Sequence, residues 1–372
     1  MARDEAEKGL REEYGRALVP WVDLERKRGQ WEGKEVESPA GRDDPRLWCG
    51  PFSALAPHEA VERALAALDA AALVREGQRV LIKVNLGGGL PGCPGSFTDP
   101  DLVRGLIRWV RARGGVAVVA EGDQRACRAD TRLLKARGYD ELLLEEGASF
   151  ESLSRGERAR VSVAGLAAPL DVPTTLLDPN VLVINAYAPK YHWECGITAA
   201  TKNLYGALYS STKGDFHRRA DVLDRVVAAA ARLVRPALSL GGGSFLGSGL
   251  GPHFTVPVRI DRVVAHRDVA SGDRFWCDVL DYPWRGVAHL GLASGGSEPT
   301  YRLVEGATPL EPAAVARIRR HAVTPRARAR WKRLLWPQYF VPHRLQRAVY
   351  PVAEQLAGRF NQAFNHPKGD PV

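Results

Sequence analysis

The chain of 372 residues is poor in the features that place a protein in a membrane or outside the cell. Nowhere do about 18 uncharged apolar residues stand together, so we expect no membrane span. The first residues, MARDEAEKGLREEYGR, are charged throughout and lack the apolar stretch of a secretory signal. These absences favour a cytoplasmic location.

Cysteine is also scarce, and its spacing argues against several kinds of site. The five cysteines are Cys49, Cys93, Cys127, Cys195 and Cys277, and no two of them form a C-x-x-C pair. This spacing argues against a disulfide framework, a zinc knuckle and an iron–sulfur cluster. His253, His266 and His289 are isolated along the chain, which argues against a dedicated metal site. We therefore expect free thiols in a reducing compartment, no metal and no required cofactor.

The basic charge of the chain is confined to one end. The net charge is +9, and the segment Glu311–Val372 alone has 12 Lys and Arg against 3 Asp and Glu. The rest of the chain is therefore neutral, and we expect no nucleic-acid partner.

The basic segment also carries the aromatic residues Trp331, Trp336, Tyr339, Phe340 and Tyr350. Such a mixture suits phosphates, a membrane surface or a partner chain. It also suits a helical extension that packs its aromatics on the body and leaves its arginines in water. We favour a helical extension docked on the body, on a protein partner or on a second copy of the chain, because the aromatics would otherwise form an exposed apolar surface.

Short apolar strands alternate with amphipathic helices along most of the chain. We expect strands at Arg79–Val84, Val116–Ala120, Arg160–Ala164, Val181–Asn185, Ala237–Leu240 and Val256–Ala265, and helices at His58–Leu73, Asp101–Arg113, 128–137, 140–146 and Asp221–Val234. This alternation predicts an α/β fold with a mostly parallel sheet covered by helices on both faces and a basic helical C-terminal extension. The predicted parts are an N-terminal helix with an irregular wrap (1–56), an α/β catalytic core (57–310) and the basic extension (311–372).

In such sheets the ligand site lies beyond the carboxyl ends of the strands. The loops expected there are residues 83–89, 121–123, 185–205 and 241–252. The last loop is rich in glycine, but it is neither a Walker A loop nor a clean G-x-G-x-x-G motif, so it is weak evidence for a nucleotide. Its backbone N–H groups could still line a pocket.

Lys83 and Asn85 stand at the end of the first predicted strand of the core, just before three consecutive glycines. A lysine in this place either attracts an anion with a buried ammonium or extends to solvent from the strand end. The sequence leaves both interpretations open.

The segment 188–206 has the most chemically active residues. Lys190, His192 and Lys202, with His217 further along, place cationic or titratable groups beside the end of one strand. From Thr198 the residues suit the start of a helix, whose free N–H groups also attract a carboxylate, phosphate or sulfate. This segment therefore predicts an anion-binding pocket.

The same segment offers groups that move protons. His192 titrates near neutrality, and Tyr191 or Tyr205 could pass on a proton beside it. Cys195 lies close to His192 in sequence and could be a nucleophile, although a buried and inert thiol is the more common case.

Four segments together resemble one protein family. They are VLIKVNL (80–86), TDPDLV (98–103), APK (188–190) and TAATKNLYG (198–206), and their order and spacing are similar to the bacterial and archaeal domain of unknown function 362. The likeness covers roughly residues 55–305, and its most specific part is the stretch 202–206 with a histidine near 217. The resemblance implies an α/β domain, fused in some members to a ferredoxin module whose cysteines this chain lacks, and it implies no settled reaction.

The chain departs from the family pattern in two places. Val84 stands where members usually have proline, and the segment 241–251 has none of the acidic residues that members usually place there. The site is expected to be more cationic as a result. Asp268 and Asp273 match acidic positions that the family places after its following strand, and they could compensate in part.

These observations lead to one functional hypothesis. The chain is expected to be a lyase-like or transferase-like biosynthetic or tailoring enzyme that binds a small metabolite bearing a carboxylate, phosphate or sulfate, and that catalyses elimination, cyclisation or group transfer. The expected catalytic residues are Lys190, His192, Lys202 and Tyr205. The expected substrate-binding residues are Lys83, Asn85, Thr198, Asn203, His217 and Asp273. Two alternatives stay open: a redox or metal-dependent enzyme, and a non-catalytic binding or assembly protein that uses the basic segment.

Overall fold

The computed structural model describes residues 44–87, 93–124, 128–163, 166–209, 213–322 and 324–335. The predicted N-terminal helix, Cys127 and the aromatics from Trp336 onward lie outside these residues. Among the described residues, no helix has the length and apolar character that a membrane span needs.

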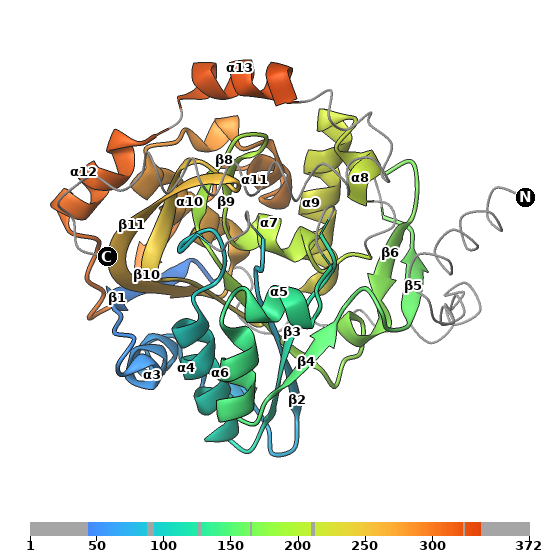
Figure 1. Ribbon diagram of the computed structural model, residues 1–372, viewed down its shortest axis with the longest axis vertical. Helices are drawn as coiled ribbons and strands as arrows, with labels where there is room; N and C mark the ends of the chain where they lie inside the picture. Colours follow the sequence, from blue (N-terminus) through green and yellow to red (C-terminus); the bar gives the residue numbers. More distant parts are fainter. Residues whose placement is uncertain are drawn as a thin grey trace, which may run out of the picture.

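One large sheet organises the fold (Figure 1). Its strands are β1 (Arg46–Pro51), β2 (Arg79–Lys83), β3 (Val116–Glu121), β4 (Ser149–Ser152), β7 (Leu182–Tyr187), β8 (Lys190–His192), β9 (Gly196–Thr198), β10 (Leu238–Leu250), β11 (Phe254–His266) and β12 (Arg302–Leu303). The order across the sheet is β12-β1-β11-β10-β7-β2-β3-β4, and β8 pairs with β10 and β9. The pairs from β10 through β7, β2 and β3 to β4 are parallel, whereas β11 is antiparallel to β1 and β10. The predicted mostly parallel sheet is confirmed.

Helices cover both faces of this sheet, as predicted. One face carries α3 (Pro57–Ala66), α4 (Pro100–Arg111) and α6 (Tyr139–Glu145), and the other carries α7 (Ala200–Tyr205), α9 (Ala220–Val234), α10 (Val269–Leu280), α11 (Ala288–Ala293) and α12 (Pro312–Arg320). Successive residues of a strand point to opposite faces. In β2, Val80 and Ile82 therefore pack on the α3 and α4 side, and Leu81 packs beside α9. Two short helices, α5 (Thr131–Lys135) and α8 (Lys213–Phe216), complete this part of the chain.

Two regions near the edges of the fold differ from the prediction. Residues 46–51 were predicted to be irregular, but they form β1, in which Leu47 and Cys49 are fully buried. The partner of β1 is β11, far along the chain, so no local pattern indicated the pairing. The strand predicted at Arg160–Ala164 is β5 (Arg158–Val161), and it belongs to a separate antiparallel pair with β6 (Leu170–Pro173).

The glycine-rich run is a strand and not the predicted loop. It forms most of β10, which pairs with β11 along its length. A Cβ atom at Gly243 would lie 2.5 Å from the Asp99 Cβ, and one at Gly247 would lie 2.8 Å from the Lys190 Cβ. Close packing of neighbouring segments, and not a cradle for a ligand, therefore accounts for glycine at these two positions.

The first part of the basic segment docks on the body. Ile318 of α12 is fully buried among residues of α10 and β11, and its carbonyl accepts a hydrogen bond of 2.7 Å from the Ser248 hydroxyl. The next helix, α13 (Pro325–Leu335), has Trp331 40% exposed, so this aromatic does not pack wholly on the body. The predicted docked helical extension is thus confirmed for α12.

We predict that Ile318→Ala lowers the free energy of unfolding by about 2–5 kcal/mol, because it removes a fully buried side chain from the contact between α12 and the sheet. Chemical denaturation measures the change. The matched control is Leu144→Ala, since Leu144 is 83% exposed and its truncation should have almost no effect. Equal effects of the two variants would contradict the docking of α12.

Candidate functional site

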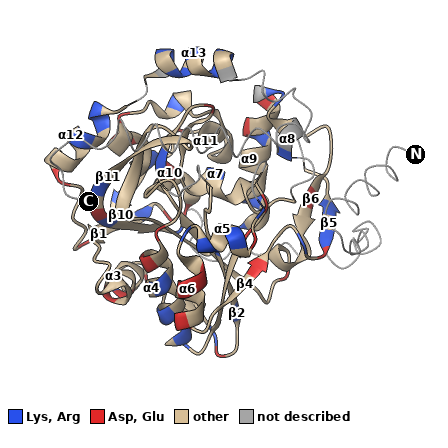
Figure 2. Cartoon of the chain, in the orientation of Figure 1, with Lys and Arg blue, Asp and Glu red and all other residues tan. Residues whose placement is uncertain are grey.

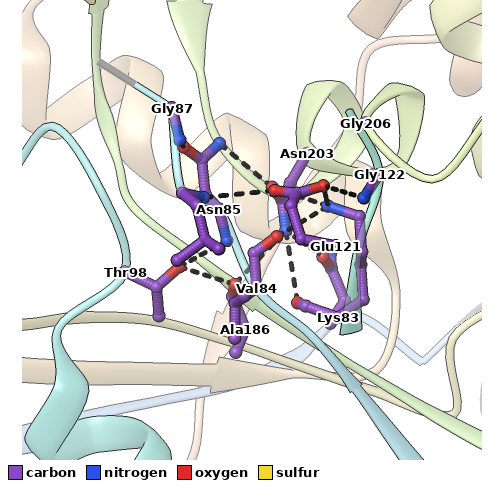
Figure 3. A network of polar contacts seen from close by, with 12 residues as sticks. Lys83, Val84, Asn85, Gly87, Thr98, Glu121, Gly122, Ala186, Asn203 and Gly206 are labelled. Atoms are coloured by element: carbon purple, nitrogen blue, oxygen red, sulfur yellow. Dashed lines mark hydrogen bonds and ion pairs between the residues drawn. The ribbon is translucent and has the colours of Figure 1, made fainter. Parts of the chain in front are cut away.

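Three of the predicted site residues, Lys83, Asn85 and Asn203, meet at the carboxyl ends of β2, β3 and β7 (Figure 3). Lys83 ends β2, Glu121 ends β3, and Asn203 of α7 lies beside Lys83. The sequence therefore located this cluster correctly in the fold. The hydrogen bonds and ion pairs of each side chain show which polar groups already have partners within the protein.

Lys83 is part of an internal ion pair. Its side chain is fully buried, and its Nζ lies 2.9 Å from Glu121 Oε1. The same ammonium donates to the Val84 carbonyl at 2.6 Å and to Asn203 Oδ1 at 3.4 Å. Burial lowers the pKa of Lys83, and the Glu121 carboxylate opposes that shift. With three partners inside the protein and no exposure, Lys83 does not extend to solvent in this structure, and its predicted substrate contact stays a prediction.

Asn203 is a structural cross-link. Its Oδ1 accepts from Asn85 Nδ2 at 3.0 Å, and its Nδ2 donates to Asn185 Oδ1 at 2.8 Å and to the Ala186 carbonyl at 3.3 Å. These bonds join α7 to the ends of β2 and β7. Asn203 thus positions its neighbours, since both atoms of its amide group are engaged within the protein.

Lys190 is buried without a carboxylate partner. It is 2% exposed, and its Nζ donates to the Ser96 carbonyl at 2.6 Å and to Asn85 Oδ1 at 3.2 Å. An ammonium has three N–H donors, so one of them has no acceptor among the described residues. Burial, and next the charge of Lys202, lower the pKa of Lys190 to about 7.

Lys202 provides the second cation of this cluster. It is half-buried, and its Nζ lies 5.4 Å from the centre of the Tyr205 ring. Within the described chain, no hydrogen bond or ion pair engages its ammonium. The Tyr205 hydroxyl donates to the Lys213 carbonyl at 2.9 Å, so the ring supports Lys202 while the hydroxyl is held by backbone.

His192 is a neutral imidazole with a defined tautomer. The backbone N–H groups of Glu194 and Cys195 donate to its Nδ1 at 3.1 and 3.3 Å. The nitrogen that accepts these bonds carries no proton, so the proton is on Nε2. Burial, and then the charge of Lys202, hold the pKa of His192 well below its ordinary value. In this state His192 is a hydrogen-bond donor through Nε2.

His217 lies next to this group but has a carboxylate partner. Its Nδ1 is 2.8 Å from Glu194 Oε2, and its ring packs edge-on against the Tyr205 ring. The carbonyl of Glu194 accepts from Arg328 of α13 at 2.7 Å. The predicted residue His217 is therefore in the cluster, and the loop that carries its partner contacts the basic helix α13.

The start of α7 is not available to a ligand as predicted. The backbone N–H of Thr201 donates to both carboxylate oxygens of Asp273 at 3.3 Å, and Asp273 is fully buried. Asp273 therefore caps α7 in the place where an external anion was expected, and its predicted role in substrate binding stays a prediction. Burial raises the pKa of Asp273 to about 6. Asp268 likewise caps α10, through the N–H groups of Ala270 and Ser271.

Thr198 precedes α7 and is paired with Lys190 in the β8–β9 hairpin. Its hydroxyl is buried and has no hydrogen-bond partner within the described chain. Sequence reasoning expected a helix start here and did not predict the hairpin. It is this hairpin that brings Thr198, Lys190 and His192 together.

Sequence reasoning also missed three charged residues of the cluster, Glu121, Lys213 and Glu194. Glu121 was inside a loop expected at a strand end, so its position was a usable signal. Lys213 donates to the Gly206 and Asp123 carbonyls at 2.7 and 2.9 Å, and burial lowers its pKa to about 8. Gly206 is only seven residues away but Asp123 is 90 residues away, and no motif marked Lys213 as part of the cluster.

The described cysteines are free thiols. Cys195 is 4% exposed, and burial raises the pKa of its thiol far above the ordinary value. This shift favours the inert thiol over the nucleophile. In the described residues, no group of three or more His, Cys, Asp and Glu side chains is arranged to hold a metal ion.

The fold and this cluster define an α/β protein with buried lysines at the carboxyl ends of its parallel strands. The sequence matches the family described as "Domain of unknown function (DUF362)" over residues 80–278. The chain belongs to this family, and the predicted resemblance is confirmed.

One curated relative is a thylakoid-associated protein of the cyanobacterium Synechocystis, which is 27% identical over 212 residues. The match covers 56% of this chain and 64% of that protein, so the chain spans less than two thirds of its relative.

Proposed function

We propose that the chain is an enzyme that binds a small metabolite bearing a carboxylate, phosphate or sulfate, and that it catalyses elimination, cyclisation or group transfer. The anion would lie against Lys190 and Lys202. The observation that supports this most is the contrast among the lysines. Lys83 has Glu121 as its counter-charge, whereas Lys190 and Lys202 have no carboxylate within ion-pair distance in the described chain.

Two adjacent cations without a counter-ion favour an external anion. Each charge raises the energy of the other in a partly buried place, where water screens them poorly. The mutual effect is visible in Lys190, whose pKa falls to about 7 through burial and then through Lys202. An anion bound between them would relieve both effects.

The other residues take supporting roles in this proposal. His192 donates a hydrogen bond from Nε2 to the leaving or developing oxygen anion, and the two lysines stabilise its charge. Asn85 holds Lys190 through its Oδ1 and Asn203 through its Nδ2, so it is a positioning residue. Tyr205 positions Lys202 with its ring.

The test is anion binding measured by calorimetry, with phosphate, sulfate and malonate as probes. An anion binds the charged form of Lys190, so affinity should fall as pH rises through about 7, by up to about tenfold per pH unit. Lys202→Met should weaken binding about 10- to 100-fold, because a charged hydrogen bond is lost. Lys135→Met, on the exposed side of α5, is the control that should bind normally. If none of the three anions binds, or if Lys202→Met binds as the wild type does, the proposal is wrong.

The catalytic part needs a second experiment. An extract of anionic metabolites is incubated with the wild type or with Lys202→Met, and mass spectrometry compares the two. A metabolite consumed only by the wild type supports an enzyme and supplies its substrate. Binding of anions without any turnover supports the alternative of a binding protein. The cytoplasmic location remains a prediction, since it rests on the sequence alone and the relative is described as thylakoid-associated.

A further inference from the structure

The outer side of α13 combines exposed apolar and basic side chains. Trp331 is 40% exposed and Leu334 is 68% exposed. Arg326, Arg330 and Arg333 are exposed as well, and the helix contains five Lys and Arg and no acidic residue. Figures 1 and 2 show α13 at the periphery of the molecule, at the top of the view.

The inner side of α13 fixes the orientation of the helix. Arg328 donates to the Glu194 carbonyl at 2.7 Å, and its guanidinium lies 5.8 Å from the centre of the Tyr282 ring. Lys332, one turn further on, is half-buried. Because this side faces the body, the opposite side is presented outward.

The outward residues form two adjoining rows. Helical spacing puts Arg326, Arg330 and Arg333 on one row, since residues three or four apart lie above one another. Trp331 and Leu334, three residues apart, form the second row, and Leu334 lies beside Arg330 of the first row. A row of cations beside a row with tryptophan and leucine is typical of helices that lie flat in a membrane interface.

We propose that α13 is a membrane-surface helix that binds anionic phospholipids. Its arginine row would meet the lipid phosphates, and Trp331 and Leu334 would enter the boundary between headgroups and acyl chains. The charge supports this partner, because the basic surplus of the whole chain falls in residues 311–372. A nucleic acid would also meet the arginines, but its phosphate backbone offers no apolar layer for Leu334. This proposal does not depend on the anion-binding function proposed above.

The test is flotation of the full-length protein with vesicles, either of pure phosphatidylcholine or with about one third phosphatidylglycerol. We expect binding to the anionic vesicles only, and weaker binding at high salt. The triple variant R326Q/R330Q/R333Q should reduce partitioning about 100-fold, because each arginine near an anionic surface contributes roughly fivefold. The double variant W331A/L334S should reduce it about tenfold, since apolar surface no longer enters the interface.

Matched variants elsewhere on the surface serve as controls. R63Q/R75Q/R132Q removes three exposed arginines of the body, and Leu144→Ser removes a leucine that is 83% exposed on α6. Both should partition as the wild type does, and thermal melting verifies that all variants are folded. Absence of binding to anionic vesicles, or equal binding by the α13 variants and the controls, overturns the proposal. Binding to heparin that W331A/L334S leaves unchanged, without vesicle binding, would instead identify a polyanion as the partner.

Discussion

Replacing Glu121 by glutamine should lower the free energy of unfolding by about 3–5 kcal/mol, because the buried ammonium of Lys83 would lose its counter-charge. Glu121 also accepts hydrogen bonds from the backbone N–H groups of Gly122 at 2.8 Å and Leu86 at 3.1 Å. A glutamine keeps one acceptor oxygen and turns an NH₂ group toward donors on the other side. Chemical denaturation at pH 7 measures the change.

Two further variants show whether the buried pair is the cause. Glu151→Gln breaks the ion pair between Glu151 of β4 and Arg79 of β2, where both side chains are partly exposed, and it should change stability by less than about 1 kcal/mol. The double variant K83M/E121Q removes both buried charges and should be more stable than E121Q alone. If E121Q is no more destabilising than Glu151→Gln, Lys83 does not depend on this carboxylate.

Lys190→Met should have opposite effects on binding and on stability. Anion affinity should fall by about 1.5–3 kcal/mol, because a charged hydrogen bond to the ligand is lost. The folded protein should become more stable at neutral pH, by about 1–3 kcal/mol after the loss of the Ser96 and Asn85 hydrogen bonds is subtracted. The gain arises because a buried cation without a counter-charge is removed.

The pH dependence of the free energy of unfolding shows whether the charge of Lys190 destabilises the folded protein. The folded pKa of Lys190 is about 7, below its ordinary value of 10.5, so the charged form is disfavoured in the folded chain. The destabilisation is absent above pH 10.5, grows as the pH falls, and is complete below pH 7. Denaturation of Lys190→Met and wild type at pH 6, 8 and 10 should therefore show a difference that shrinks toward high pH. A constant difference would show that Lys190 is not a destabilising cation.

Strands with continuous apolar runs could be predicted from the sequence, and the glycine run could not. The run Val80–Ile82 has the buried pattern of a central parallel strand, and β2 is that strand. Residues 241–250 of β10 were interpreted as a loop because glycine is common in turns, whereas the strand predicted at Ala237–Leu240 covers its start. The reason for glycine there is the closeness of Asp99 and Lys190, which come from other parts of the chain. Local patterns cannot show such contacts.

The location of the cluster followed from topology, but the role of each residue did not. Parallel strands deliver their following loops to one edge, and this placed Lys83, Asn85 and Lys190 together. Whether the charge of a buried lysine is balanced depends on whether a carboxylate lies within ion-pair distance of its ammonium. Glu121 lies opposite Lys83, and no carboxylate pairs with Lys190 in the described residues. That difference depends on tertiary contacts, because neither lysine has a carboxylate beside it in the sequence.

The capping of α7 by Asp273 has a thermodynamic consequence for any ligand of Lys202. The helix is fixed at its start by Asp273 and near its end by Lys213, which donates to the Gly206 carbonyl. The backbone that carries Lys202 is therefore already ordered before a ligand arrives. Only the lysine side chain has to be immobilised, an entropic term of roughly 1.5–2 kcal/mol, while ordering the backbone of a mobile loop would add 1–2 kcal/mol for each of its residues. Even a small anion, which makes few contacts, can then be held at this position.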